Sequence, residues 1–328
     1  MSWLVRSQLV NSPFADPGLL VSFLFRPRAI LFDLGDVTEV PARELARVTH
    51  AFVSHRHMDH FAGFDRVLRL RLNRADTLRI VGPPGMTEGV RAKLDGYSWN
   101  LLDATSTDFA ILVADFEGER LGPWTAFRAR DAFRPTDAGP SDLPPGLVLS
   151  EDDLRIEAAT LDHGLPCLGF ALQERARVNV RPDGLATLGL TPGPWLQAAK
   201  SAVRRDDPDD APVDLPDGRR IPLGALREAA FRTAPGQRLA YVTDAGFTPG
   251  NAERIVGLAR DAHHLYIEAA FLQEDEPLAA ARRHLTARQA GTLAREAGAR
   301  RMTTFHHSPR YLDRPFALRE EAEAAFAP

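Results

Sequence analysis

The stretch Val53-Ser54-His55-Arg56-His57-Met58-Asp59-His60 decides the expected fold, because it places four metal-binding side chains directly after an apolar run. The residues from Ala51 to Val53 are typical of the end of a buried strand. The apolar residues between Phe61 and Leu68 follow the spacing of a helix. The four side chains therefore lie on a loop between a strand and a helix.

The spacing within this loop predicts a site for two metal ions. His55 and His57 alternate with Arg56 and can point to one side, while Asp59 and His60 begin the next turn. Imidazole and carboxylate ligands suit Zn²⁺, and an incomplete protein shell leaves room for a metal-bound water. Two ions about 3.5–4 Å apart would lower the pKa of that water toward 7. We therefore expect a two-metal hydrolase, with a polar surface loop as the alternative.

A two-metal site needs further ligands, and three isolated residues later in the chain follow predicted strands. Active sites of layered sheets collect where strands end and loops begin. A carboxylate that follows a strand, as Asp244 does, is suited to bridging two cations. The three further candidates are His163, Asp244 and His306.

Composition limits the class of protein. A chain of 328 residues with 44% hydrophobic content can bury a large core, and we expect one domain with an insertion. The net charge of −4 leaves any nucleic-acid contact to a local patch. The single cysteine, Cys167, excludes an internal disulfide and argues for a reducing compartment, with the cytoplasm as the default. No apolar run approaches the roughly 18 residues of a membrane span.

Strands and helices alternate along most of the chain, which predicts the α/β class. Turn residues crowd between about residues 174 and 236, and this density marks a protruding insertion. Thr286 is expected to cap a helix that Gly298 ends. The predicted strands are Leu20–Phe25, Ala29–Phe32, Ala51–Ser54, Leu78–Val81, Ala158–Leu161, Arg238–Val242 and Met302–Phe305, with several between Phe109 and Phe133, and the predicted helices are Pro41–Arg47, Thr87–Leu94 and Ala287–Ala297.

The chain resembles the metallo-β-lactamase superfamily and, within it, the ribonuclease Z family. The resemblance runs from about Ile30 to Tyr311. It is carried by His55-x-His57-x-Asp59-His60, Asp162 to Phe170, Tyr241 to Asp244, His284 to Ala287, and Ala294 to Arg301 followed by His306 to Tyr311. The resemblance implies an αββα sandwich that spans residues 1–328 as a single domain, with residues 174–236 as an inserted arm.

The resemblance also implies a role for each site residue. His55, His57 and His163 would hold one zinc ion, Asp59, His60 and His306 would hold the other, and Asp244 would bridge them. Asp59 is the candidate general base. His284 would protonate the leaving oxygen.

The implied substrate is a tRNA precursor, whose 3′ trailer a metal-bound hydroxide would remove. Ser308 and Arg310 match the phosphate-holding residues of the family. Gly193 and Pro194 match a step in the arm that grips tRNA, and the family resemblance suggests a homodimer. Lys200, Arg204 and Arg205 could contact RNA phosphates, although the acidic cluster Asp206–Asp210 would repel them.

Departures from the family pattern keep other functions open. Val37 and Glu39 replace a glycine and a neutral glutamine in the segment after Asp33. The metal site could then serve a small phosphodiester, a sulfate or a lactone, since fold and metals do not fix the substrate. A redox di-iron centre would need a carboxylate at His57. A catalytically silent RNA-binding scaffold is the remaining alternative.

Overall fold

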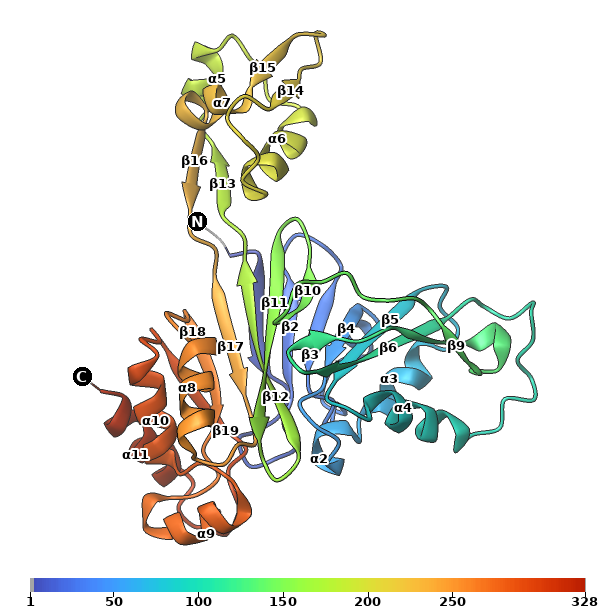
Figure 1. Ribbon diagram of the computed structural model, residues 1–328, viewed down its shortest axis with the longest axis vertical. Coiled ribbons are helices and arrows are strands. Elements are labelled where there is room, and N and C mark those ends of the chain that lie inside the picture. The colour runs from blue at the N-terminus through green and yellow to red at the C-terminus, as the bar shows by residue number, and fades with distance from the viewer. Residues whose placement is uncertain (1–2, 328) are drawn as a thin grey trace. The chain divides into compact units, whose positions relative to one another are not determined.

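The computed structural model describes residues 3–327 and divides them into two compact units (Figure 1). The first unit contains the residues through Val148, the segment Ile156–Ala171, and the chain from Arg238 onward. The second unit contains Leu149–Arg155 and Leu172–Gln237. Each unit has its own hydrophobic core, so each is described separately.

A mixed sheet forms one half of the first unit. Its strands β3 to β6 are parallel, while β1 and β2 extend it in antiparallel fashion. The predicted strands Leu20–Phe25 and Ala29–Phe32 correspond to β2 and β3, which pair in antiparallel fashion. In order across the sheet the strands are β1 (Val5–Leu9), β2 (Leu19–Phe23), β3 (Ala29–Phe32), β4 (Val48–Phe52), β5 (Thr77–Gly82), β6 (Ala110–Glu117), β8 (Thr125–Arg128) and β9 (Pro135–Asp137), with β7 (Arg120–Leu121) paired to β6.

A second sheet faces the first. Its strands β17, β18 and β19 are parallel, so their carboxyl ends meet at one edge. The predicted strands Arg238–Val242 and Met302–Phe305 are confirmed with these bounds. In order the strands are β10 (Leu147–Ser150), β11 (Leu154–Asp162), β12 (Pro166–Glu174), β17 (Arg238–Val242), β18 (His264–Glu268) and β19 (Met302–Phe305).

Aromatic side chains fill the space between the two sheets. Alternate residues of a strand point to opposite faces, so Leu31 packs toward the helices while Phe32 points toward the second sheet. The Phe32 ring lies 5.5 Å from that of Phe170 and 5.8 Å from that of Tyr241, measured between centroids. This buried aromatic layer holds the two sheets face to face.

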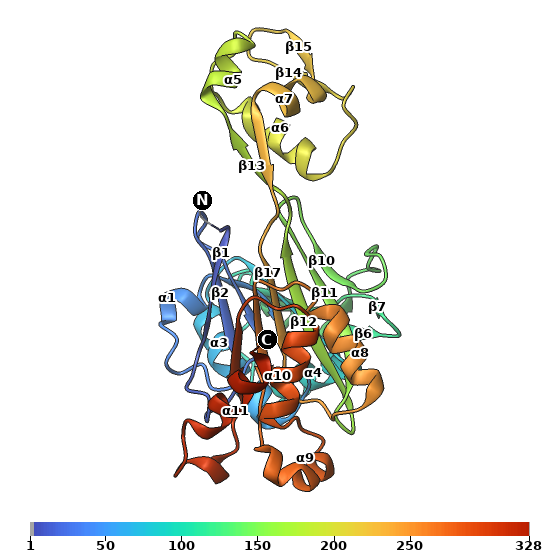
Figure 2. The same ribbon diagram turned by 90° about the vertical axis from the view of Figure 1, so that its left-hand side faces the viewer.

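Helices cover the outer face of each sheet (Figures 1 and 2). The predicted capping of the helix after Thr286 is confirmed, because Thr286 and Gln289 exchange hydrogen bonds. Within residues 3–327, no helix has the length and apolar character to cross a membrane. The helices of this unit are α1 (Ala42–Leu45), α2 (Met58–Phe61), α3 (Phe64–Arg71), α4 (Met86–Asp95), α8 (Pro249–Leu258), α9 (Glu276–Arg282), α10 (Ala287–Glu296) and α11 (Ala317–Phe326), with single turns η1 (Ala129–Asp131), η2 (Gln273–Asp275) and η3 (Pro309–Tyr311).

The second unit holds the residues in which the sequence predicted an arm, 174–236. Two short antiparallel ribbons and three helices surround a core that contains Trp195, Val203 and Leu226. Gly193 and Pro194 lead into α6, and the Gly193 Cα lies so close to the Trp195 ring that an added Cβ would approach it to 3.1 Å. The elements are β13 (Arg177–Val180), α5 (Pro182–Thr187), α6 (Trp195–Arg204), β14 (Pro212–Asp214), β15 (Arg220–Pro222), α7 (Leu223–Ala229) and β16 (Phe231–Ala234).

Candidate metal centre

The loop that follows β4 presents its four ligand-type side chains as the sequence spacing suggests. His55 is buried just after the strand, and His57 is the residue before α2. Asp59 and His60 lie within α2 itself. Arg56 packs instead against α4, where a Cβ added to Gly85 would lie 2.8 Å from its guanidinium. The histidines on either side of Arg56 are thereby left to the site.

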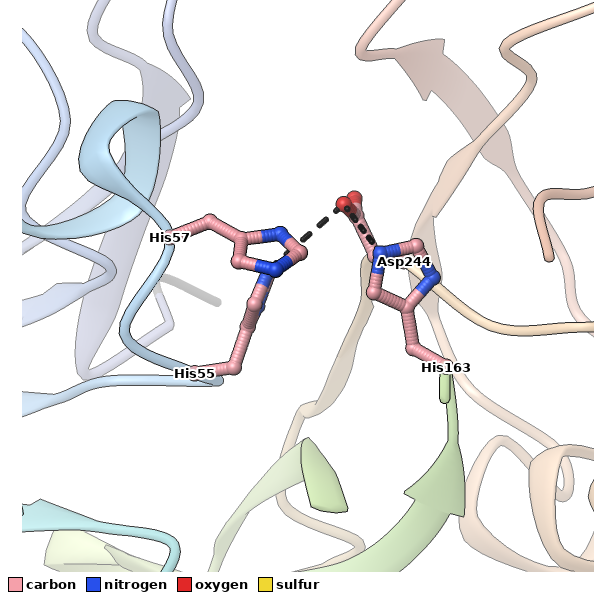
Figure 3. Close-up of side chains that lie close together, drawn as sticks. All are labelled: His55, His57, His163 and Asp244. Carbon is pink, nitrogen blue, oxygen red and sulfur yellow. Dashed lines mark ion pairs between the residues drawn. The ribbon is translucent and has the colours of Figure 1, made fainter. Parts of the chain in front are cut away.

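Asp244 is the point on which ligands from distant segments converge (Figure 3). Its Oδ2 lies 3.6 Å from Nε2 of His55, and 3.5 Å from Nε2 of both His60 and His163. Its Oδ1 lies 3.2 Å from Nδ1 of His306. The ring of His57 completes the arrangement, 4.4 Å from that of His55 between centroids. One buried carboxylate thus faces four imidazoles.

A second group of ligands adjoins the first. The Oδ2 atom of Asp59 lies 3.4 Å from Nε2 of His60 and 3.1 Å from Nε2 of His306. Among the described residues, three groups have ligand atoms within 4.8 Å of one another, and two of them match the predicted sets: His55, His57, His163 and Asp244; and Asp59, His60 and His306. Each group could hold a metal ion, and both adjoin Asp244.

Unpaired buried nitrogens show that the donor set fits a metal. Nε2 of His55, Nε2 of His60 and Nδ1 of His306 are buried with no hydrogen-bond partner among the described residues. A buried polar atom without a partner is costly, and a cation at the point of convergence would satisfy all three. Nδ1 of His307 is also unpaired, but His307 belongs to none of the metal-competent groups found in residues 3–327.

Asp33 fixes the orientation of His60, although the sequence did not predict it as part of the site. This buried carboxylate accepts hydrogen bonds from Oγ of Ser54 at 2.9 Å and from the hydroxyl of Tyr241 at 2.8 Å. Its Oδ2 lies 2.9 Å from Nδ1 of His60, which leaves Nε2 of that ring for the metal side. Asp33 follows β3, so the rule that found Asp244 at a strand end could have found it too.

The charges of the cluster suit metal binding. Burial favours the neutral form of His60, but Asp244 and Asp33 outweigh it and hold the pKa of His60 well above its ordinary value. Burial, with the neighbouring His60, lowers the pKa of His55 to about 2. Burial opposes ionisation of Asp244, yet His306 and His60 keep the pKa of this carboxyl well below its usual range. Burial therefore keeps His55 in the neutral form that a metal ligand needs, and the carboxylates around His60 would also stabilise a metal cation at this point.

Glu268 pairs with His284 beside the cluster. Its Oε2 lies 2.8 Å from Nδ1 of His284, and its Oε1 accepts a hydrogen bond from the backbone N–H of Ala245 at 2.7 Å. Burial disfavours the charged imidazole, but the Glu268 carboxylate and Asp244 raise the pKa of His284 to about 9. The sequence did not predict Glu268 as a site residue, although it is the last residue of β18 and meets the strand-end rule.

A cavity of about 310 Å³ opens beside the second ligand group. Ser308 lines it, while the guanidinium of Arg310 lies 3.3 Å from Oδ2 of Asp275 and is not part of the lining. Val37 is buried in the core and Glu39 is exposed elsewhere, so neither altered residue borders this cavity. The lining residues are Phe14, Ala15, Asp16, Asp59, Ala270, Phe271, His284, His306, His307, Ser308 and Pro309.

Comparison with curated proteins decides the family. The chain is 35% identical over 285 residues to the ribonuclease Z of Deinococcus radiodurans, covering 86% of this chain and 83% of that protein. The chain belongs to the ribonuclease Z family. A second ribonuclease Z, from Salinibacter ruber, is 31% identical over 307 residues, covering 91% of this chain and 81% of that protein. No protein-family profile matches the sequence.

Solved structures confirm the predicted αββα fold. The metallo-β-lactamase fold protein YhfI from Bacillus subtilis matches with a TM-score of 0.56 and 15% identity, covering 98% of this chain and 93% of that one. The short form of human tRNase Z matches with a TM-score of 0.53 and 15% identity, covering 93% of each chain. This ribonuclease Z family member therefore has the metallo-β-lactamase fold.

Proposed function

We propose that this member of the ribonuclease Z family is a zinc-dependent endoribonuclease that removes the 3′ trailer from tRNA precursors. The observation that carries the proposal is the convergence of buried imidazoles on Asp244, with three ring nitrogens left unpaired. Its curated relatives bear the name ribonuclease Z, and they are similar to this chain over most of its length. The cavity beside Asp59 offers room for a phosphodiester.

Two zinc ions fit the two ligand groups. His55, His57 and His163 would hold one ion, Asp59, His60 and His306 would hold the other, and Asp244 would bridge them. When bound, the ions would polarise the phosphate oxygens and make water a nucleophile near neutral pH. Asp33 and the backbone carbonyl of Arg283, 2.8 Å from Nδ1 of His163, orient two of the imidazole ligands.

In this proposal Asp59 and His284 move protons. The side chain of Asp59 is 41% exposed and borders the cavity, so its carboxylate can contact the water whose proton it would accept. His284 borders the same cavity, and Glu268 occupies its Nδ1. The Nε2 atom of His284 is left to donate a proton to the oxygen that leaves the scissile phosphate.

In this proposal Ser308 holds the phosphate. Its Oγ accepts a hydrogen bond from the backbone N–H of Arg310 at 3.3 Å, which leaves its O–H to donate to a phosphate oxygen. Arg310 pairs with Asp275 through Nε, so its other N–H groups remain available to a second phosphate oxygen. The phosphate role of both residues is part of the proposal.

The arm would supply a modest basic surface for RNA. Lys200 and Arg204 lie one turn apart on α6, and burial and the charge of Arg204 lower the pKa of Lys200. The acidic cluster repels RNA less than the sequence suggests, because Arg227 pairs with Asp209. Gly193 and Pro194 would act by shaping the start of α6. We also propose that the protein is a homodimer and that it is located in the cytoplasm.

The test combines metal analysis with two substrates. The purified protein should contain about two zinc ions per chain and should hydrolyse bis(p-nitrophenyl) phosphate. It should also cut a tRNA precursor at the start of its 3′ trailer. Hydrolysis of the small diester without cleavage of the precursor would replace the tRNA function with that of a small-molecule phosphodiesterase. A metal-loaded protein that hydrolyses neither would favour a silent scaffold.

A further inference from the structure

A second cavity, of about 420 Å³, adjoins the first and shares His284 with it. This size is within the range of about 300–1,000 Å³ that ligand pockets have. The catalytic role proposed for His284 places the leaving oxygen at the junction of the two cavities. The second cavity is lined by Asp162, Gly246, Phe247, Thr248, Glu276, Ala280, Arg283, His284 and Gln289.

Phe247 is the unusual residue of this cavity. It follows Asp244 by three positions, on the loop between β17 and α8, yet 48% of its surface is exposed. The loop is fixed from beneath by Asn251, whose Nδ2 donates to the carbonyl oxygens of Gly246 at 2.8 Å and Asp162 at 2.9 Å. Asn251 itself is buried. An exposed aromatic ring is thereby held on a fixed support beside the metal centre.

The charges around the cavity favour a neutral, flat ligand over a phosphate. Nη1 of Arg283 lies 2.9 and 3.1 Å from the two carboxylate oxygens of Asp162, so its positive charge is balanced. Glu276 adds a carboxylate, which accepts hydrogen bonds from Gln289 at 3.1 Å and Gln273 at 2.8 Å. Two carboxylates and the cations of Arg283 and His284 line the cavity, so it offers a phosphate group no net positive charge. A nucleobase would meet an exposed ring and polar groups that can bond its edge.

We propose that Phe247 is a stacking platform for the nucleobase next to the scissile phosphate, with the second cavity as the binding site of that base. The inference rests on the proposed function, since it assumes an RNA substrate. The phosphate would lie in the first cavity, over Asp59 and Ser308, and the neighbouring base would cross His284 to reach Phe247. Every base has a π face, so the platform tolerates different sequences.

The test pairs variants of Phe247 with precursors that lack one base. Phe247→Ala should lower kcat/KM for the precursor about 5- to 150-fold, and Phe247→Trp should keep most of it, because base stacking has this range of strength. The precursor is also made with an abasic residue on one side or the other of the cleavage site. Wild type and Phe247→Ala should cleave one of these two substrates equally well, because it lacks the base that would stack on Phe247. Phe25→Ala is the matched control, because Phe25 is 68% exposed and lines neither cavity.

A binding measurement separates failure of this inference from failure of the proposed function. A short single-stranded oligoribonucleotide containing 2-aminopurine should bind wild type with quenched fluorescence, and Phe247→Ala should reduce both affinity and quenching. This readout does not require cleavage. Equal binding by the two proteins, or reduced cleavage that does not depend on the missing base, would overturn the stacking site. Loss of zinc or a change of oligomeric state in Phe247→Ala would overturn it in favour of a structural role.

Discussion

The candidate metal centre of the first unit and the arm in the second unit differ in the burial of their charged side chains and in the partners of those side chains. At the metal centre, Asp244 is buried and lies within 3.6 Å of imidazoles that come from distant segments. In the arm, charges are exposed and pair with close neighbours in sequence, as Arg205 does with Asp207 at 2.7 Å. Exposed pairs of this kind contribute about 0–1 kcal/mol. A buried carboxylate on which several imidazoles from distant segments converge indicates a site, whereas surface pairs between close neighbours in sequence do not.

The largest difference in zinc content and cleavage is expected between two variants that each lose one carboxylate, one in each region. Asp244→Ala should lower zinc content and precursor cleavage to background, because the proposed bridge between the two ligand groups is removed. Asp207→Ala in the arm should retain both, since its partner Arg205 is exposed. Zinc is measured by elemental analysis and cleavage by gel assay. If Asp244→Ala kept two zinc ions, the convergence would not be a metal site.

A smaller loss is expected from His284→Ala. It should lower kcat about 10²- to 10⁴-fold, the range for loss of a general acid, while zinc content stays unchanged. Glu268→Gln should cause a similar but weaker loss, because it removes the charge that Nδ1 of His284 faces. Turnover by His284→Ala at the wild-type rate would contradict the proposed acid.

Asp33→Asn tests whether Asp33 orients the proposed metal ligand His60. The amide cannot give His60 the carboxylate that now lies 2.9 Å from its Nδ1, so zinc affinity should fall about 10- to 100-fold. Competition with a chromophoric chelator measures this change. Unchanged affinity in a folded Asp33→Asn protein would show that His60 is oriented by other contacts.

Substitutions in the arm should have the smallest effect on cleavage of the precursor. Replacing both Lys200 and Arg204 with alanine should raise KM for the precursor a few-fold, with kcat unchanged. The salt dependence of log KM should become shallower by about 0.7 to 0.9 for each RNA phosphate that the arm no longer neutralises. Arg205→Ala is the matched control and should change neither, because Asp207 already pairs with Arg205. An equal rise in KM for Arg205→Ala would contradict a specific contact of Lys200 and Arg204 with RNA.

The strands that lead into the candidate site and the helix cap beside it followed from the sequence because the signals were local. The strand before His55, the strand before Asp244 and the cap at Thr286 each depend on a few consecutive residues. Asp33 and Glu268 also stand at strand ends, as Asp244 does, but this position alone does not tell which histidine a carboxylate supports. Their roles appear only when β3, β4 and β18 bring them to His60 and His284.

Contacts between side chains that are distant in the sequence could not be predicted either. The pairing of Arg310 with Asp275 joins side chains 35 residues apart. The burial of Val37 could not be predicted from a loop-like segment, yet it shows that this departure from the family pattern lies in the core. The order of residues indicates the ligand types, whereas packing determines which polar atoms remain free to bind a metal.

The most direct measurement of the central claim is cleavage of a tRNA precursor by protein with a known zinc content. The account predicts that protein with about two zinc ions per chain cuts at the start of the 3′ trailer, that chelation abolishes cutting, and that added zinc restores it. An intact precursor in the presence of fully zinc-loaded wild-type protein would contradict the account.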